Sequence, residues 1–144
     1  MTHPYPFGTV RATGGMREVE VSRFVRAGPA IVEGVLTPTT LLEAEGSFTV
    51  RAVSEDGRRV TVGGYGLELA FAFDEREDGI EYEQIEGPLE VLRTTVTYEP
   101  ENEGTRLTAR SEVAVGGPGL VDRVAAWKRR GELGRALEGI AEEC

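Results

Sequence analysis

The chain has 144 residues, of which 40% are hydrophobic and 28% are charged, a mix typical of one folded domain rather than of a disordered chain. Its formal net charge of −9 argues against nucleic acid as a partner, because the phosphates would be repelled. The single histidine, His3, and the single cysteine, Cys144, lie near the two ends, which excludes an internal disulfide and argues against a Cys- or His-based metal centre and a Ser-His-Asp triad.

The basic residues are almost all arginine. One lysine, Lys128, stands against 15 arginines, and this acidic, lysine-poor pattern predicts a halophilic protein from a high-salt cytoplasm, although a GC-rich genome would give the same bias. No apolar run approaches the roughly 18 residues of a membrane span. The N-terminal residues contain no apolar signal segment, so we expect a cytoplasmic protein.

The N-terminal part divides at residue 16. Residues 1–15 are rich in Pro and Gly and predict a flexible tail, with residues 16–144 forming a single domain and Met16 as an alternative start. Alternating valines predict a half-buried strand over 16–25. Arg23 falls on its apolar face, where it would need an ionic partner or could bind a ligand carboxylate; the other interpretation places it at a sheet edge or beside a glutamate.

Two short helices are predicted next. The first spans Ala30–Leu36, because Pro29 suits a first helical turn and Pro38 prevents its continuation. The second spans Thr39–Ala44, with Thr37 as its N-terminal cap.

From residue 47 to residue 115 the apolar residues recur with a period of two. Glycine-rich or acidic turns every 8–16 residues predict an antiparallel meander of five or six strands. The glycines of 63–66 mark either a tight hairpin or a kink within one long strand.

The last segment changes to a helical period and predicts one helix over Leu120–Glu143, about 35 Å long. Trp127 should face the sheet. The glycines of this helix cost helix propensity, and we interpret them as sites of close approach to the sheet or of a bend. Its predicted inward face consists of Leu120, Val124, Trp127, Leu133, Leu137 and Ile140.

This order of elements predicts an α+β fold. A curved antiparallel sheet of six or seven strands wraps around the long C-terminal helix, and the two short helices after strand 1 close one end. Because a strongly curved sheet cannot press one helix against all of its inner residues, we expect a space between the sheet and the helix.

Three stretches carry a resemblance to a known superfamily: VEVSRFVRAGPAIVEGVL at 19–36, GLELAFAFDEREDGIEYEQIEGPL at 66–89 and VTYEPENEGTRLTARSEV at 96–113. Together with the C-terminal helix they resemble the helix-grip fold of START/Bet v1-like proteins, and more narrowly the polyketide cyclase/dehydrase (SRPBCC) group. The resemblance implies a pocket for a hydrophobic small molecule or lipid. It carries over no catalytic residue and no cofactor. The sequence departs from these families after Val32 and around Glu43–Glu45, where aromatic residues are usual.

Two sets of residues are candidates for the lining of such a pocket. The first set is polar or amphipathic on inward strand faces, and a ligand pocket needs a few such groups among apolar walls; in the alternative interpretation these groups bond to one another. The second set is apolar and serves equally as plain core. The candidates are Tyr82, Gln84, Thr94, Tyr98 and Ser111 in the first set, and Leu69, Phe71, Phe73 and Trp127 in the second.

Other local patterns give weaker signals. The acidic run 74–79 is not a calcium loop of the EF-hand type, because Arg76 and Ile85 occupy ligand positions. Gly63–Gly66 is no phosphate loop, since no helix follows. We interpret Lys128-Arg129-Arg130 as a solvated helix surface near Glu132; it could instead face an acidic partner.

Three functions remain open. The first is a carrier or sensor that binds a hydrophobic small molecule or lipid without catalysis, as a monomer or homodimer and with no cofactor. The second is an enzyme of the polyketide cyclase/dehydratase type that uses Tyr82 or Tyr98 as the acid. Both need a cavity of several hundred Å³. The third is a protein-interaction module, which would have a collapsed pocket and an exposed apolar patch.

Overall fold

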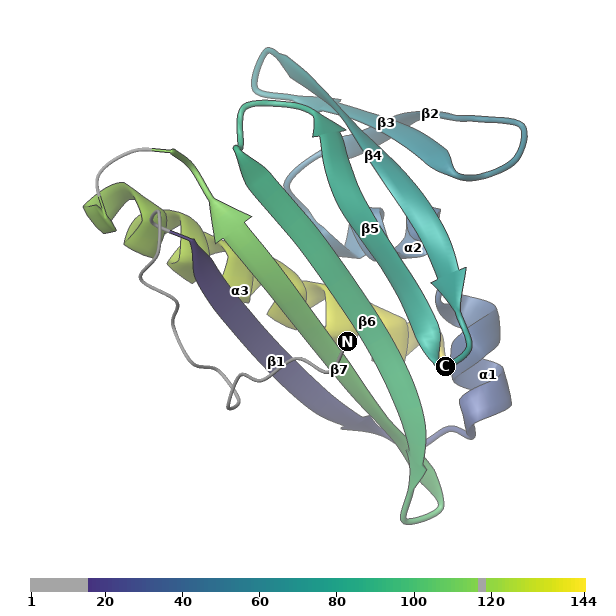
Figure 1. Cartoon of the computed structure of the whole chain (residues 1–144). Helices are drawn as coiled ribbons and strands as arrows, with labels where there is room; N and C mark the ends of the chain where they lie inside the picture. Colours follow the sequence, from purple (N-terminus) through teal and green to yellow (C-terminus); the bar gives the residue numbers. More distant parts are fainter. Residues whose placement is uncertain (1–15, 117–118) are drawn as a thin grey trace.

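The computed structural model describes residues 16–116 and 119–144, so the expected tail over residues 1–15 lies outside the described residues. One seven-stranded sheet has the order β1-β7-β6-β5-β4-β3-β2, and all of its pairings are antiparallel. Figure 1 shows the three helices of the described chain on one side of this curved sheet. The elements are β1 (Arg17–Val25), α1 (Pro29–Val35), α2 (Pro38–Glu45), β2 (Thr49–Val53), β3 (Arg59–Gly64), β4 (Leu67–Arg76), β5 (Gly79–Glu86), β6 (Val91–Glu101), β7 (Gly104–Ala114) and α3 (Gly119–Glu143).

The two faces of the sheet differ in polarity. The outer face carries ion pairs between neighbouring strands: Arg93 of β6 lies 3.2 Å from Glu83 of β5, and Arg110 of β7 lies 2.6 Å from Glu20 of β1. The inner face is mostly apolar, with a few buried polar residues, and forms most of the core. This separation is the direct result of the period-two pattern, because successive strand side chains point to opposite faces.

The glycine-rich segment between β3 and β4 forms a hairpin, which decides between the two interpretations of residues 63–66. Tyr65 and Gly66 occupy the two turn positions with φ values of 55° and 75°. Positive φ at both positions is the geometry of the two-residue turns that match the twist of antiparallel strands.

The two short helices begin and end where the sequence predicts, within one or two residues. The Thr37 side chain caps α2 by accepting a hydrogen bond from the Thr40 backbone N–H at 3.2 Å. Gly46 ends α2 with φ 81°, a left-handed conformation that glycine adopts at little cost. Val32, Leu41 and Leu42 point into the core.

The long helix α3 packs against β1, β7 and α2, as Figure 1 shows for the strands. Leu133, Leu137 and Ile140 are buried, as predicted, and Ala136 lies with them. Gly139 is a site of close approach, because a Cβ there would lie 2.6 Å from the Ala44 Cβ. The element that comes close is α2 rather than the sheet.

The predicted inward face is wrong in the N-terminal half of α3. Val124 is 57% exposed and Trp127 is 76% exposed, while the side chain of Leu120 lies outside the description. The residue four positions before Leu133 is Arg129, which is buried. In this half of α3 the large apolar residues therefore lie outside the buried face of the helix. That face is formed there by polar and small side chains.

Two further expectations concern charge and membranes. Arg23 is exposed on β1, an edge strand, so the interpretation of an inward arginine that binds a carboxylate is wrong. Within the described part of the chain, no helix combines the length and apolarity that a membrane crossing requires.

Candidate functional site

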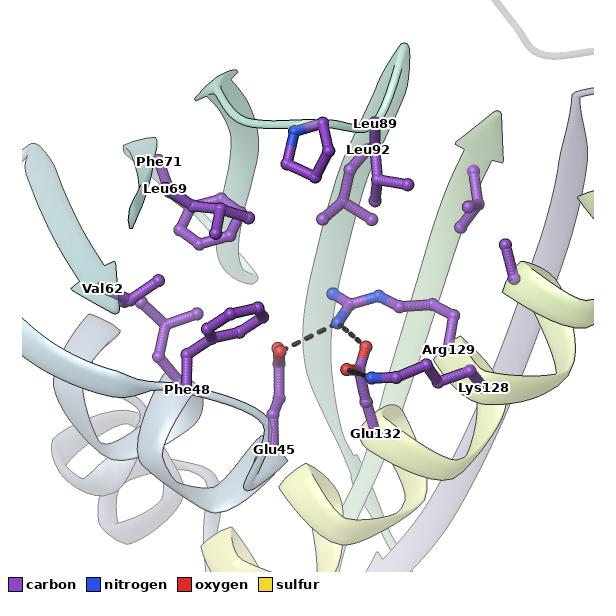
Figure 2. A pocket seen from close by; sticks show the side chains of 14 residues that line it. Glu45, Phe48, Val62, Leu69, Phe71, Leu89, Leu92, Lys128, Arg129 and Glu132 are labelled. Carbon is purple, nitrogen blue, oxygen red and sulfur yellow. Dashed lines mark hydrogen bonds and ion pairs between the residues drawn. The ribbon is translucent and has the colours of Figure 1, made fainter. Parts of the chain in front are cut away.

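A cavity of about 190 Å³ lies between the sheet, α2 and α3. Most of its walls are apolar, and its polar groups all come from α2 and α3. Figure 2 shows Phe48, Leu69 and Phe71 on the side opposite α3. The lining residues are Leu42, Glu45, Phe48, Val62, Leu69, Phe71, Pro88, Leu89, Leu92, Val113, Ala125, Lys128, Arg129 and Glu132.

Arg129 is the centre of the polar end of the cavity, and its residue is only 3% exposed. A guanidinium has five N–H donors, and all five have acceptors here. Nη1 donates to Glu45 at 2.8 Å and to Glu132 at 3.0 Å. The remaining donors reach the Tyr82 hydroxyl at 2.5 Å, Thr94 Oγ1 at 2.7 Å and Ser111 Oγ at 3.2 Å.

Two carboxylates balance this charge. Glu45, at the end of α2, accepts from Arg129 on one oxygen and from the Tyr82 hydroxyl on the other. Glu132, one turn along α3, accepts from Arg129, from Ser47 and from Lys128, whose Nζ lies 2.7 Å away. Two cations and two anions therefore meet at this end of the cavity, with no net charge.

Burial and these partners shift the pKa values of the ionisable side chains around Arg129. Burial raises the pKa of the Tyr82 phenol far above its usual value, and the nearby Glu45 carboxylate raises it further. Burial is the largest single effect and acts to lower the pKa of Arg129, but the interactions with Glu45, Tyr82 and Glu132 together outweigh it, and the pKa lies well above normal. For Glu132, burial acts to raise the pKa, yet Arg129 and the hydrogen bonds from Lys128 and Ser47 lower it below its usual range. Arg129 and Glu132 are therefore charged, and Tyr82 is neutral, at physiological pH.

Aromatic rings hold Tyr82 in place behind the cavity wall. Its ring stacks on Phe73, with centroids 4.6 Å apart and planes at 21°, and meets Phe71 edge to face at 5.6 Å. All three residues are buried. This packing fixes the hydroxyl between Arg129 and Glu45.

The residues singled out in the sequence fall into separate groups. Leu69 and Phe71 line the cavity, while Phe73 packs behind it. Thr94 and Ser111 are buried and lie 2.9 Å apart, joined by a hydrogen bond between their hydroxyl oxygens. Together with Tyr82 they belong to the Arg129 cluster, so the alternative in which polar residues bond to one another applies to them.

Gln84 does not line the cavity, but it bonds to Leu89, which does. Its Nε2 donates to the Leu89 carbonyl at 2.7 Å, and its buried Oε1 has no hydrogen-bond partner among the described residues.

Two other candidates, Tyr98 and Trp127, lie away from the cavity. Tyr98 borders a separate hollow near α1, and the exposed indole of Trp127 faces an open groove beside β1. The expectation that Trp127 faces the sheet is therefore wrong.

Sequence reasoning missed Arg129, Glu45 and Glu132. The interpretation of Lys128-Arg129-Arg130 as a solvated surface is wrong for Arg129. Two signals were available: Arg129 continues the buried stripe at a spacing of four residues, and Glu45 lies where the sequence departs from the aromatic residues of the resembling families.

A larger hollow of about 690 Å³ lies at the opposite end of the sheet, near Tyr98. Its walls carry exposed charged residues such as Asp56, Arg58 and Asp74, so it is a solvated groove rather than an apolar site. Among the residues that the structure describes, no group of three or more His, Cys, Asp or Glu side chains could hold a metal ion.

Solved structures with the same arrangement include three that cover most of the chain. The protein TTHA0849 from Thermus thermophilus aligns with a TM-score of 0.71 and 19% identity over 88% of this chain and 95% of that one. A START superfamily protein from Mycobacterium smegmatis gives 0.65 and 18% over 87% and 97%. Norcoclaurine synthase from Thalictrum flavum, in a truncated form, gives 0.68 and 15% over 88% and 92%.

No protein-family model matches the sequence, and no curated protein does. The likeness therefore concerns the fold. This chain has a curved sheet of seven antiparallel strands, two short helices after the first strand and a long C-terminal helix packed on the sheet, and 87–88% of it aligns with these structures. The chain has the helix-grip fold of START and Bet v1-like proteins.

Proposed function

We propose that the protein binds a hydrophobic small molecule or lipid in the cavity between the sheet and α3, as a carrier or sensor without catalysis. The observation that carries this proposal is a cavity with mostly apolar walls, whose charged lining side chains all belong to α2 and α3. Ligand sites commonly combine apolar walls with a few polar groups that fix orientation.

The cavity volume limits the size of the ligand. At about 190 Å³ it is smaller than the several hundred Å³ expected from the sequence. An apolar cavity of about 150 Å³ is large enough for benzene. The buried part of the ligand is therefore about one or two rings in size, and a longer molecule would extend out past the rim.

The enzyme alternative has less support from the geometry. The Tyr82 hydroxyl already donates to Glu45 and accepts from Arg129, and its raised pKa disfavours its ionisation. Tyr98 borders a different hollow. Neither phenol is placed as a free acid that faces the cavity.

The test uses N-phenyl-1-naphthylamine, an uncharged probe whose fluorescence rises in apolar sites. The wild-type protein should bind it with one site, and Ala125→Phe, which places a ring in the cavity lining, should weaken binding at least about tenfold. Ala126→Phe is the matched control, because this partly buried neighbour lines the groove beside Trp127 instead. Circular dichroism checks that both variants are folded. Equal loss in both, or no binding by wild type, contradicts the proposal.

The interaction-module alternative is favoured by one observation. Val121, Val124 and Trp127 are exposed at successive turns of α3, and a contiguous apolar patch on a surface often marks a contact site. If this function is correct, sedimentation of wild type at rising concentration should show self-association, and Trp127→Ala should abolish it. A wild-type protein that stays monomeric contradicts self-association through this patch.

A further inference from the structure

The hydrogen-bonding state of the polar groups in the cavity restricts the chemical class of its ligand. We propose that it accepts a ring-sized apolar molecule with a neutral hydrogen-bond donor, such as a phenol or alcohol, and rejects a carboxylate of the same size. This inference rests on the proposed function, because it concerns the same cavity.

The buried cation, Arg129, has no hydrogen-bond donor left for a ligand. Each of the five N–H groups of Arg129 has an acceptor within the cluster. A carboxylate that entered the cavity would have to displace Glu45, Glu132 or a hydroxyl from Arg129. The buried arginine is therefore a structural centre and not an anion receptor.

The carboxylates of Glu45 and Glu132, in contrast, can accept further hydrogen bonds. A carboxylate offers about four lone-pair positions. Among the described residues, Glu45 uses two of these, for Arg129 and Tyr82, and Glu132 uses three, for Arg129, Ser47 and Lys128. Both residues line the cavity. The polar end of the cavity is therefore suited to receive a hydrogen bond rather than to donate one.

Lys128 is the remaining cation to consider. Its side chain is 59% exposed, and two of its three N–H donors already have acceptors in Glu132 and Ser47. The third donor belongs to an exposed ammonium, which water can reach. A ligand carboxylate at Lys128 would also lie close to the negative charge of Glu132, which opposes binding. The net charge of −9 over the whole chain further disfavours the approach of an anion.

The unpaired oxygen of Gln84 also favours a ligand that donates a hydrogen bond. Its Oε1 is buried without a partner among the described residues, and its Nε2 donates a hydrogen bond to the carbonyl of Leu89, a lining residue. A buried polar atom without a partner is uncommon and costs free energy. The polar atoms left with open capacity in and beside the cavity are therefore mainly acceptors.

The experiment compares three ligands with one ring system: naphthalene, 2-naphthol and 2-naphthoate at pH 7, each displacing N-phenyl-1-naphthylamine. We expect 2-naphthol to bind about tenfold tighter than naphthalene, since a hydrogen bond to a charged acceptor has a net value of this size. We expect 2-naphthoate to bind at least about tenfold more weakly than naphthalene. Equal or tighter binding of 2-naphthoate overturns the inference, as does a 2-naphthol no better than naphthalene.

Two variants separate the sources of the effect. Lys128→Met should weaken the binding of 2-naphthoate further, because it removes the one lysine that lines the cavity. Glu45→Gln should reduce the preference for 2-naphthol over naphthalene; if this variant does not fold, the wild-type series and Lys128→Met still decide. Failure of the proposed function looks different: the probe does not bind wild type, or Ala125→Phe binds it normally. A bound probe with the opposite order of the three ligands refutes only the ligand class.

Discussion

Arg129 of α3 and Glu45 of α2 form an ion pair of 2.8 Å although 84 positions separate them in the chain. Both side chains are almost fully buried, at 4% and 8% exposure. The pair joins the long helix to the short one at the polar end of the cavity. The geometry of the candidate site therefore depends on the docking of two helices that are remote in sequence.

Removal of the arginine should destabilise the protein strongly. Arg129→Met leaves Glu45 buried without a cation and Glu132 with Lys128 alone, and a broken buried pair costs about 3–5 kcal/mol. The neighbouring Arg130 is exposed, and Arg130→Met should change the free energy of unfolding by less than about 0.5 kcal/mol. Denaturant unfolding followed by circular dichroism measures both values. Similar losses in the two variants would show that the Arg129 cluster contributes little.

The tyrosine in the cluster should resist alkali. Its pKa is raised in the folded state by burial and by Glu45, so its contribution to stability is present below pH ~10, the unfolded pKa, and declines as pH rises above that value. Ultraviolet titration should count one fewer ionising tyrosine in the folded protein than in the unfolded one. Tyr82→Phe should remove this difference, whereas Tyr65→Phe, at an 84% exposed residue, should leave it. A Tyr82→Phe variant that keeps the difference contradicts the assignment.

Glu132 should contribute to acid sensitivity. Its pKa is lowered in the folded state, so its stabilising effect is complete above the unfolded pKa of about 4.3 and is lost as pH falls below it. Glu132→Gln should therefore lower stability at pH 7 and flatten the decline below about pH 4. Glu138→Gln, at an exposed residue of the same helix, serves as the control. Unfolding free energies measured across this range decide, and an unchanged acid limb in Glu132→Gln would be the contrary result.

Two glycines of α3 should respond in opposite ways to alanine. At Gly139 a new Cβ meets the Ala44 Cβ at 2.6 Å, whereas nothing lies within 4 Å of one at Gly134. Gly134→Ala should stabilise the protein by up to about 1 kcal/mol through helix propensity. Gly139→Ala should be destabilising by about 1 kcal/mol or more, because overpacking of this kind costs about 1–3 kcal/mol. The two thermal midpoints provide the comparison, and a stabilised Gly139→Ala would mean that α2 shifts freely.

The acidic, lysine-poor composition predicts greater stability in molar KCl than in dilute buffer. Salt screens the mutual repulsion of a chain with net charge −9. The exposed arginine–carboxylate pairs that salt also weakens, such as Arg58–Asp74 at 2.7 Å, contribute little each. Urea unfolding at the two salt concentrations measures the change, and a loss of stability in molar salt would refute the halophilic interpretation.

The periodicity of the sequence determined most of the fold. Alternation over residues 47–115 predicted the meander, Pro29, Thr37 and Pro38 located the two short helices, and a change to a helical period located α3. These are local effects of backbone geometry and side-chain alternation, so neighbouring residues suffice to indicate them. The same local pattern left the turn at 63–66 undecided, because a hairpin and a kink use the same glycines.

Only the tertiary structure decided the polar end of the cavity. The face of α3 that is buried depends on its contacts with β1, β7 and α2, and these contacts turn Arg129 inward while Trp127 points to solvent. Hydrophobicity predicts the opposite orientation, because a lone arginine is costly to bury. The burial of Arg129 becomes tolerable when α2, α3 and three strands supply acceptors for all of its donors. These acceptors belong to Glu45, Glu132, Tyr82, Thr94 and Ser111. That compensation exists only after distant segments have come together, and therefore no local pattern could reveal it.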